Sequence, residues 1–103
     1  SGTENAFMGL GAAQSNTTGN YNTAIGGRYA LALNTTGSSN TAVGYSALYA
    51  NTTASQNTAV GAQALTNNTT GAQNVALGFY SLNSNDEVFV LTVVCVQMYQ
   101  LLS

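Results

Sequence analysis

The stretch Asn40-Thr-Ala-Val-Gly-Tyr-Ser-Ala-Leu-Tyr-Ala-Asn-Thr-Thr53 decides the fold, because nearly the same residues return 17 positions later, from Asn57 onward. The glycine that ends the apolar run recurs at spacings of 17, 18, 17 and 17 residues, at Gly9, Gly26, Gly44, Gly61 and Gly78. A second set of asparagines keeps the same period, at Asn16, Asn34, Asn51, Asn68 and Asn85. A repeat of fixed length indicates a stacked solenoid.

Each repeat predicts a short strand that ends at a glycine corner, a second short apolar segment and an Asn-Thr-Thr turn. In the central repeat these parts are residues 40–44, 45–48 and 51–53. Two helices and a turn need about 33 residues, so the short repeat favours two strands and two corners instead. We therefore predict an all-β chain, a parallel β-solenoid or β-roll with a 17-residue repeat.

Stacked coils place equivalent residues about 4.8 Å apart, so each position of the repeat becomes a ladder. We expect one buried apolar ladder of Met8, Ile25, Val43, Val60 and Leu77, and a second of Leu48, Leu65 and Leu82. A third ladder, in which amide should bond to amide, contains Asn22, Asn40, Asn57 and Asn74. The corner ladder contains Gly26, Gly44, Gly61 and Gly78. All four ladders are interpreted as structural.

The repeat divides the chain into residues 1–87, about five coils, and an apolar tail, residues 88–103. Leu91 lies 17 residues after Asn74, which permits a degenerate sixth coil. The spacing of Val88, Leu91, Cys95, Met98 and Leu102 also fits the start of a coiled-coil neck or assembly segment. The β-branched residues of the tail favour a strand. The tail is too short and too interrupted for insertion into a membrane.

Charged residues make up 4% of the chain: Arg28, Glu4, Asp86 and Glu87. One arginine cannot neutralise several phosphates, which excludes a nucleic-acid partner. The chain has no histidine, no lysine and one cysteine, Cys95, so general bases, metal ligands and activated nucleophiles are missing. We expect no catalytic residues, no metal site, no cofactor and no enzymatic activity.

The repeats Asn40-Thr-Ala-Val-Gly44 and Asn57-Thr-Ala-Val-Gly61, with their Asn-Thr-Thr turns, resemble head repeats of trimeric autotransporter adhesins and related repeats of phage tail-fibre proteins. The resemblance covers residues 5 to about 85. It implies a left-handed β-roll with three chains around one axis. It also implies a place outside the cell, at a cell or virion surface, and a role in attachment to a host surface or glycan. The tail matches neither family.

Self-association is also expected on physical grounds, because the thin layer of side chains in such a small coil removes little apolar area from water. Lateral assembly, with a trimer favoured, and end-to-end stacking are both open. The predicted function is a structural fibre or filament segment that spaces or mediates surface attachment.

The turns leave one alternative function and one modification open. An ice- or glycan-binding surface would use two threonine rows, Thr17, Thr35, Thr52 and Thr69 with Thr18, Thr36, Thr53 and Thr70. In a eukaryotic source, Asn16, Asn34, Asn51, Asn67 and Asn68 would be acceptors for glycosylation, because each precedes x-Thr.

Overall fold

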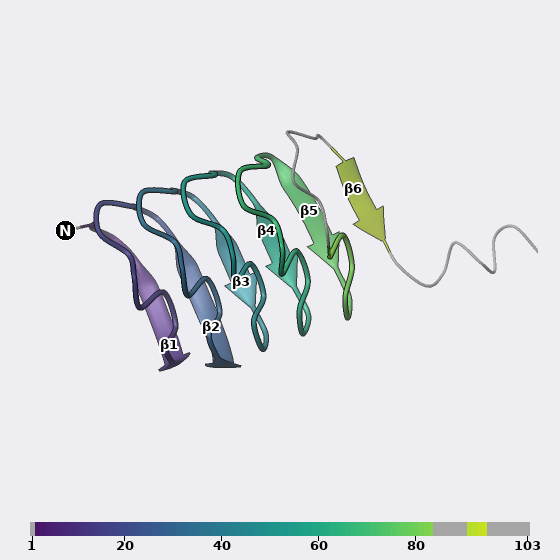
Figure 1. Ribbon diagram of the computed structural model, residues 1–103, viewed down its shortest axis with the longest axis horizontal. Helices are drawn as coiled ribbons and strands as arrows, with labels where there is room; N and C mark the ends of the chain where they lie inside the picture. Colours follow the sequence, from purple (N-terminus) through teal and green to yellow (C-terminus); the bar gives the residue numbers. More distant parts are fainter. Residues whose placement is uncertain (1, 84–90, 95–103) are drawn as a thin grey trace, which may run out of the picture.

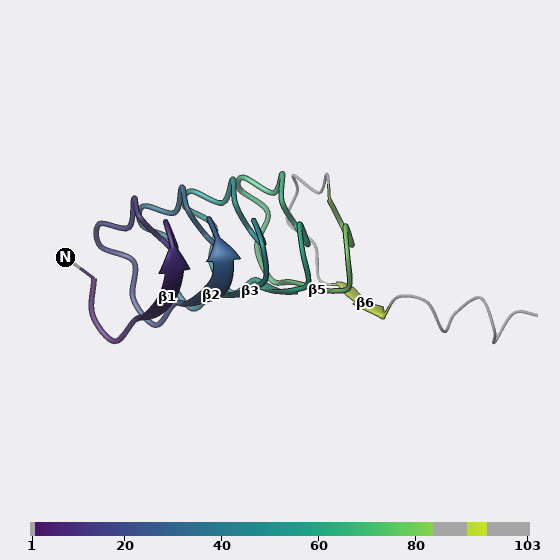
Figure 2. The same ribbon diagram turned by 90° about the horizontal axis from the view of Figure 1, so that it is seen from below.

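A computed structural model describes residues 2–83 and the backbone of residues 91–94. The strands are β1 (Ala6–Leu10), β2 (Thr23–Arg28), β3 (Thr41–Val43), β4 (Thr58–Val60), β5 (Asn74–Leu77) and β6 (Leu91–Val94). They form one sheet in sequence order, and every neighbouring pair is parallel. Between β1 and β5, each connection leaves the sheet, passes behind it and returns one strand further along, as Figures 1 and 2 show. The protein is therefore an all-β parallel β-solenoid.

The strands pair with the register that the repeat predicts. Thr41 lies opposite Thr58, Ala42 opposite Ala59 and Val43 opposite Val60. The longer second repeat is accommodated by an irregularity between Met8 and Leu10, where Leu10 pairs with Arg28. The extra residue therefore lies at the end of β2, and the phase of the later coils is unchanged.

The apolar ladder of Met8, Ile25, Val43, Val60 and Leu77 exists, but the prediction that it is buried is wrong. Met8 is 67% exposed, and Ile25, Val60 and Leu77 are each 38% exposed. In β2 to β5 the residue directly before each ladder position points inward instead, and Ala24, Ala42, Ala59 and Ala76 are fully buried, whereas Phe7, which has this position in β1, is 40% exposed. Because side chains alternate along a strand, only one of these two columns can face the core. Alanine occupies it because the coil is too thin for larger side chains from both walls.

The opposite wall of the core is the predicted leucine ladder, which is confirmed for Leu48 and Leu65 and extends to Leu31. Leu82 is partly buried and packs against this cluster. The segment that carries these leucines is not the second strand that we expected. Ser46 and Leu48 have φ values of 56° and 54°, and the intervening Ala47 N–H donates to the Gly44 carbonyl. The alternation of positive and negative φ curls the segment into successive turns, so each coil contributes one strand.

The corner glycines are needed where the backbone leaves the sheet. Gly44 and Gly61 have φ values of 126° and 130°, which side-chain-bearing residues rarely adopt. A Cβ on Gly61 would lie 2.7 Å from the carbonyl carbon of Gly78 in the next coil. Gly26 is the exception in this ladder, because its own φ is not positive and it lies inside β2.

In the tail, β6 pairs with β5 so that Leu91 lies opposite Asn74, the register that a 17-residue repeat gives. The pairing shows a strand over Leu91–Val94. Residues 84–90 and 95–103, with most of the predicted heptad positions, lie outside the described residues.

Candidate functional site

Two columns of asparagine hold the coils together. The first column starts the strands and contains Asn5, Asn22, Asn40, Asn57 and Asn74, of which the last four are buried. From Asn5 to Asn57, each Oδ1 accepts the backbone N–H of the next asparagine, at 2.9 Å from Asn40 to Asn22 and 3.0 Å from Asn57 to Asn40. Each Nδ2 of these four donates to a carbonyl in the turn that leads to the next strand, as from Asn40 to Ala54 at 2.9 Å. The expected amide-to-amide bonding is therefore wrong for this column, because its amides bond to backbone.

Amide-to-amide bonds occur in the second column, before the turns. Asn34 Nδ2 donates to Asn16 Oδ1 at 2.8 Å, and Asn51 Nδ2 donates to Asn34 Oδ1 at 2.9 Å. The same Nδ2 of Asn51 also donates to the Ala54 carbonyl at 3.0 Å, which closes its own turn. From the sequence alone, these asparagines are recognised only as periodic turn residues. The hydrogen bonds by which they join neighbouring coils are not predicted.

Each column ends with unpaired atoms within the described residues. Asn68 Oδ1 and both polar side-chain atoms of Asn74 are buried and have no hydrogen-bond partner there. In every earlier coil the equivalent atoms bond to the coil that follows. The two side chains therefore have the chemistry to hold one further coil of the same kind.

The second column also contains four of the five asparagines that precede x-Thr. The side chains of Asn34, Asn51 and Asn68 are fully enclosed, and Asn16 is half-buried. A glycan on a buried amide would remove a donor from the ladder and would not fit inside the coil. Asn67 is the acceptor position that the structure leaves exposed.

The two threonine rows differ in their exposure. The first row is partly used inside the fold, because Thr17 Oγ1 donates to the Thr35 carbonyl at 3.0 Å and Thr35 Oγ1 to the Thr52 carbonyl at 3.2 Å. Thr36 and Thr53 of the second row are exposed. Both rows lie in the turns that follow the second asparagine column and not on the sheet.

The outer face of the sheet carries a continuous row of apolar side chains. It carries the ladder of Met8, Ile25, Val43, Val60 and Leu77. At the end of the strands it continues into a second line of Leu10, Arg28, Tyr45, Ala62 and Phe79, in which Leu10 is 63% and Phe79 71% exposed. Apolar residues scattered singly on a surface are ordinary, but contiguous apolar patches mark interaction sites.

Charged groups are sparse on this surface. Glu4 and Arg28 are the charged side chains among the described residues, and both are exposed. The guanidinium carbon of Arg28 lies 5.2 Å from the ring centre of Tyr29, which in turn makes an edge contact with Tyr49. Among residues 2–83, no group of three or more metal-ligating side chains lies together. In the same part of the chain no helix has the length and apolarity to cross a membrane.

Comparison of the chain with known protein families, with curated proteins and with solved structures finds no match.

Proposed function

We propose that this protein is a structural segment of an extracellular fibre, in which copies associate laterally through the outer face of the sheet. The observation that carries the proposal is the outward ladder of Met8, Ile25, Val43, Val60 and Leu77, one apolar side chain in each of five coils, in which Val43 is half-buried and the others are exposed. Burying these side chains against another surface supplies the favourable free energy that the thin alanine and leucine core lacks.

The period of the ladder favours a second copy as the partner. A surface that contacts every coil must itself repeat at the spacing of parallel strands, about 4.8 Å. A second copy has that spacing by construction, and the ladder contains no charge that would repel it. The resemblance of the repeats to those of trimeric adhesins and tail fibres supports three copies and a place on a cell or virion surface.

A threonine array for ice or glycans is the weaker candidate. Two hydroxyls of its first row already donate to carbonyls of the next coil, and both rows lie on turns.

The test is a charge placed on the outer face. The Val60→Lys variant should keep its β-sheet circular dichroism, because the side chain points away from the core, and should sediment as smaller species than the original chain. Thr53→Lys, a change at an exposed position on a turn, should leave the assembly intact. A wild-type chain that is a folded monomer at micromolar concentration would refute the proposal, as would unchanged assembly of Val60→Lys.

A further inference from the structure

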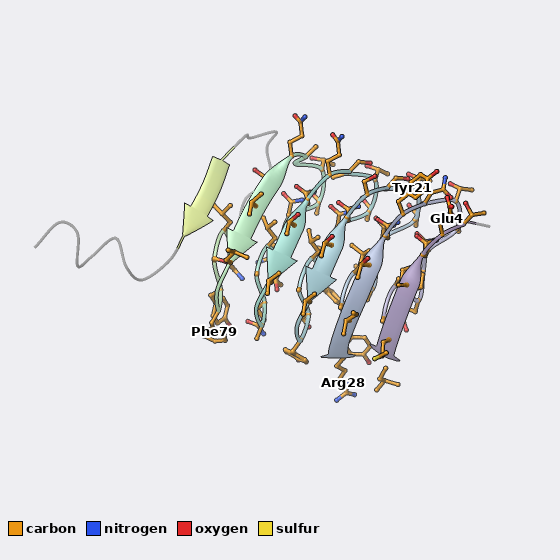
Figure 3. All side chains as sticks on the ribbon, turned by 180° about the vertical axis from the view of Figure 1, so that it is seen from behind. Glu4, Tyr21, Arg28 and Phe79 are labelled. Atoms are coloured by element: carbon orange, nitrogen blue, oxygen red, sulfur yellow. The ribbon has the colours of Figure 1, made fainter. Side chains whose placement is uncertain are left out.

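We propose that neighbouring copies meet corner to corner, with Arg28 of one copy against Tyr21 and Glu4 of the next. This inference rests on the lateral association proposed above and adds the residues and the direction of the contact. It starts from two exposed lines that flank the outer face of the sheet, and Figure 3 labels residues of both.

The strand-start corner is the line of residues directly before the first asparagine column: Glu4, Tyr21, Ser39, Gln56 and Gln73. All five are exposed and have φ values between 57° and 66°. The strand-end corner is the line defined above as Leu10, Arg28, Tyr45, Ala62 and Phe79. The two corners lie at opposite ends of the strands, so each copy has two different edges.

The irregularity in β2 gives the strand-end corner its one charge. The extra residue of the second repeat brings Arg28 into line with Leu10, where the later coils have Tyr45, Ala62 and Phe79. The strand-start corner carries Glu4 in the first coil and Tyr21, 60% exposed, in the second. The positive and negative side chains of the described residues are therefore at opposite corners and one coil apart.

These groups cannot meet within one copy. The six residues of β2 separate the two corners by about 20 Å at 3.3 Å per residue. Between copies they can meet. In a closed ring around an axis parallel to the stack, every copy has the same height and the strand-end corner of one faces the strand-start corner of the next.

At equal heights Arg28 lies level with the next copy's Tyr21, and the next copy's Glu4 is one coil away, about 4.8 Å along the axis. A guanidinium suits both neighbours, because it stacks on an aromatic ring and donates hydrogen bonds to a carboxylate. The contact joins unlike edges, so it makes the ring directional, and the apolar ladders of all copies then face the common axis.

Disulfide trapping tests the contact directly. In a Cys95→Ser background, Arg28→Cys combined with Tyr21→Cys should form covalent oligomers on mild oxidation, seen on non-reducing gels. A bridge within one copy is excluded, because the two Cα atoms of a disulfide lie within about 7 Å. The matched control combines Arg28→Cys with Gln73→Cys, which lies in the same corner but three coils from Tyr21, about 14 Å away. This control should remain uncrosslinked.

Charge reversal gives a second measurement that leaves the backbone unchanged. Arg28→Glu should raise the concentration for half-assembly about fivefold, the effect of one exposed ion pair. Adding Glu4→Arg should restore it. Assembly without crosslinking of the Tyr21 pair, or equal crosslinking of both pairs, would overturn the corner contact while leaving lateral association standing. A monomeric wild-type chain would overturn both.

Discussion

Asn57 shows how a single residue type joins one coil to the next. Its Oδ1 accepts the N–H of Asn74 at 2.9 Å, and its Nδ2 donates to the carbonyl of Gly71 at 2.7 Å. Asn74 starts the next strand and Gly71 lies in the turn that leads to it, and both residues are buried. A carboxylate could accept but not donate, and a hydroxyl is too short to reach both groups. The hydrogen bonds that its side chain makes between coils therefore explain why asparagine recurs at this position.

Replacement of this amide has a large expected cost. Asn57→Ala leaves the buried N–H of Asn74 without its partner, whereas the carbonyl of Gly71 still accepts from Asn68 Nδ2 at 2.9 Å. One unpaired buried group costs about 1–3 kcal/mol, so we expect the free energy of unfolding to fall by about that amount. Asn67→Ala removes the same amide from an exposed position, where its Nδ2 makes a long, solvent-exposed hydrogen bond to Asn83 Oδ1 at 3.3 Å, and should change stability by less than about 0.5 kcal/mol. Equal losses in the two variants, measured by denaturant titration, would show that the ladder contributes no more than an ordinary surface asparagine.

At the scale of the element, the sequence predicts where each strand lies but not which of its faces is inside. The period, the parallel register and the corner glycines follow from spacing alone. In Thr-Ala-Val, however, both alanine and valine are apolar, and the larger residue was assigned to the core. The interior is narrow because Leu48 and Leu65 already fill it from the opposite wall. That wall depends on positive φ at non-glycine residues, for which the sequence carries no simple signal.

The corner contact depends on information that the repeat hides. Spacing identifies the second repeat as one residue longer, but it does not show where the extra residue lies. The register of β1 with β2 places it at the end of the strand and brings Arg28 into line with Leu10. Departures from a repeat, more than the repeat itself, therefore point to the residues that distinguish one coil from another.

Glycine at the end of a strand has two different roles, which one pair of variants separates. Gly61→Ala would force a Cβ to within 2.7–2.8 Å of the backbone of Gly78 at a φ of 130°, so it should lower the free energy of unfolding by more than about 1 kcal/mol. Gly27→Ala has open space around its Cβ and no positive φ, so it should be neutral or stabilise by about 0.4–1 kcal/mol. Thermal unfolding of the two variants measures both effects. Similar destabilisation in both would contradict the assigned corner geometry.

At the scale of the whole molecule, contacts between strands follow sequence order, because each strand pairs with the strands directly before and after it. Hydrogen bonds between neighbouring coils repeat with the same donors and acceptors. In such an architecture the total stability is approximately a sum over coils and their interfaces. Whole coils can then be added or removed without loss of the fold. A change in length by part of a coil would put unlike positions of the repeat next to each other.

Deletion of one whole coil tests this view of the molecule. Removal of residues 41–57 joins Asn40 to Thr58, and every ladder then continues without a shift because Thr58 lies opposite Thr41. The shortened chain should keep its β-sheet circular dichroism and lose about 1–3 kcal/mol, the share of 17 residues in an ordinary domain. Duplication of the same residues should raise the melting temperature. Removal of residues 41–49, about half a coil, places turn residues where a strand must pair, so this chain should not fold. If the chain without residues 41–49 unfolds as cooperatively as the chain without residues 41–57, the alignment of equivalent residues in neighbouring coils does not stabilise the solenoid.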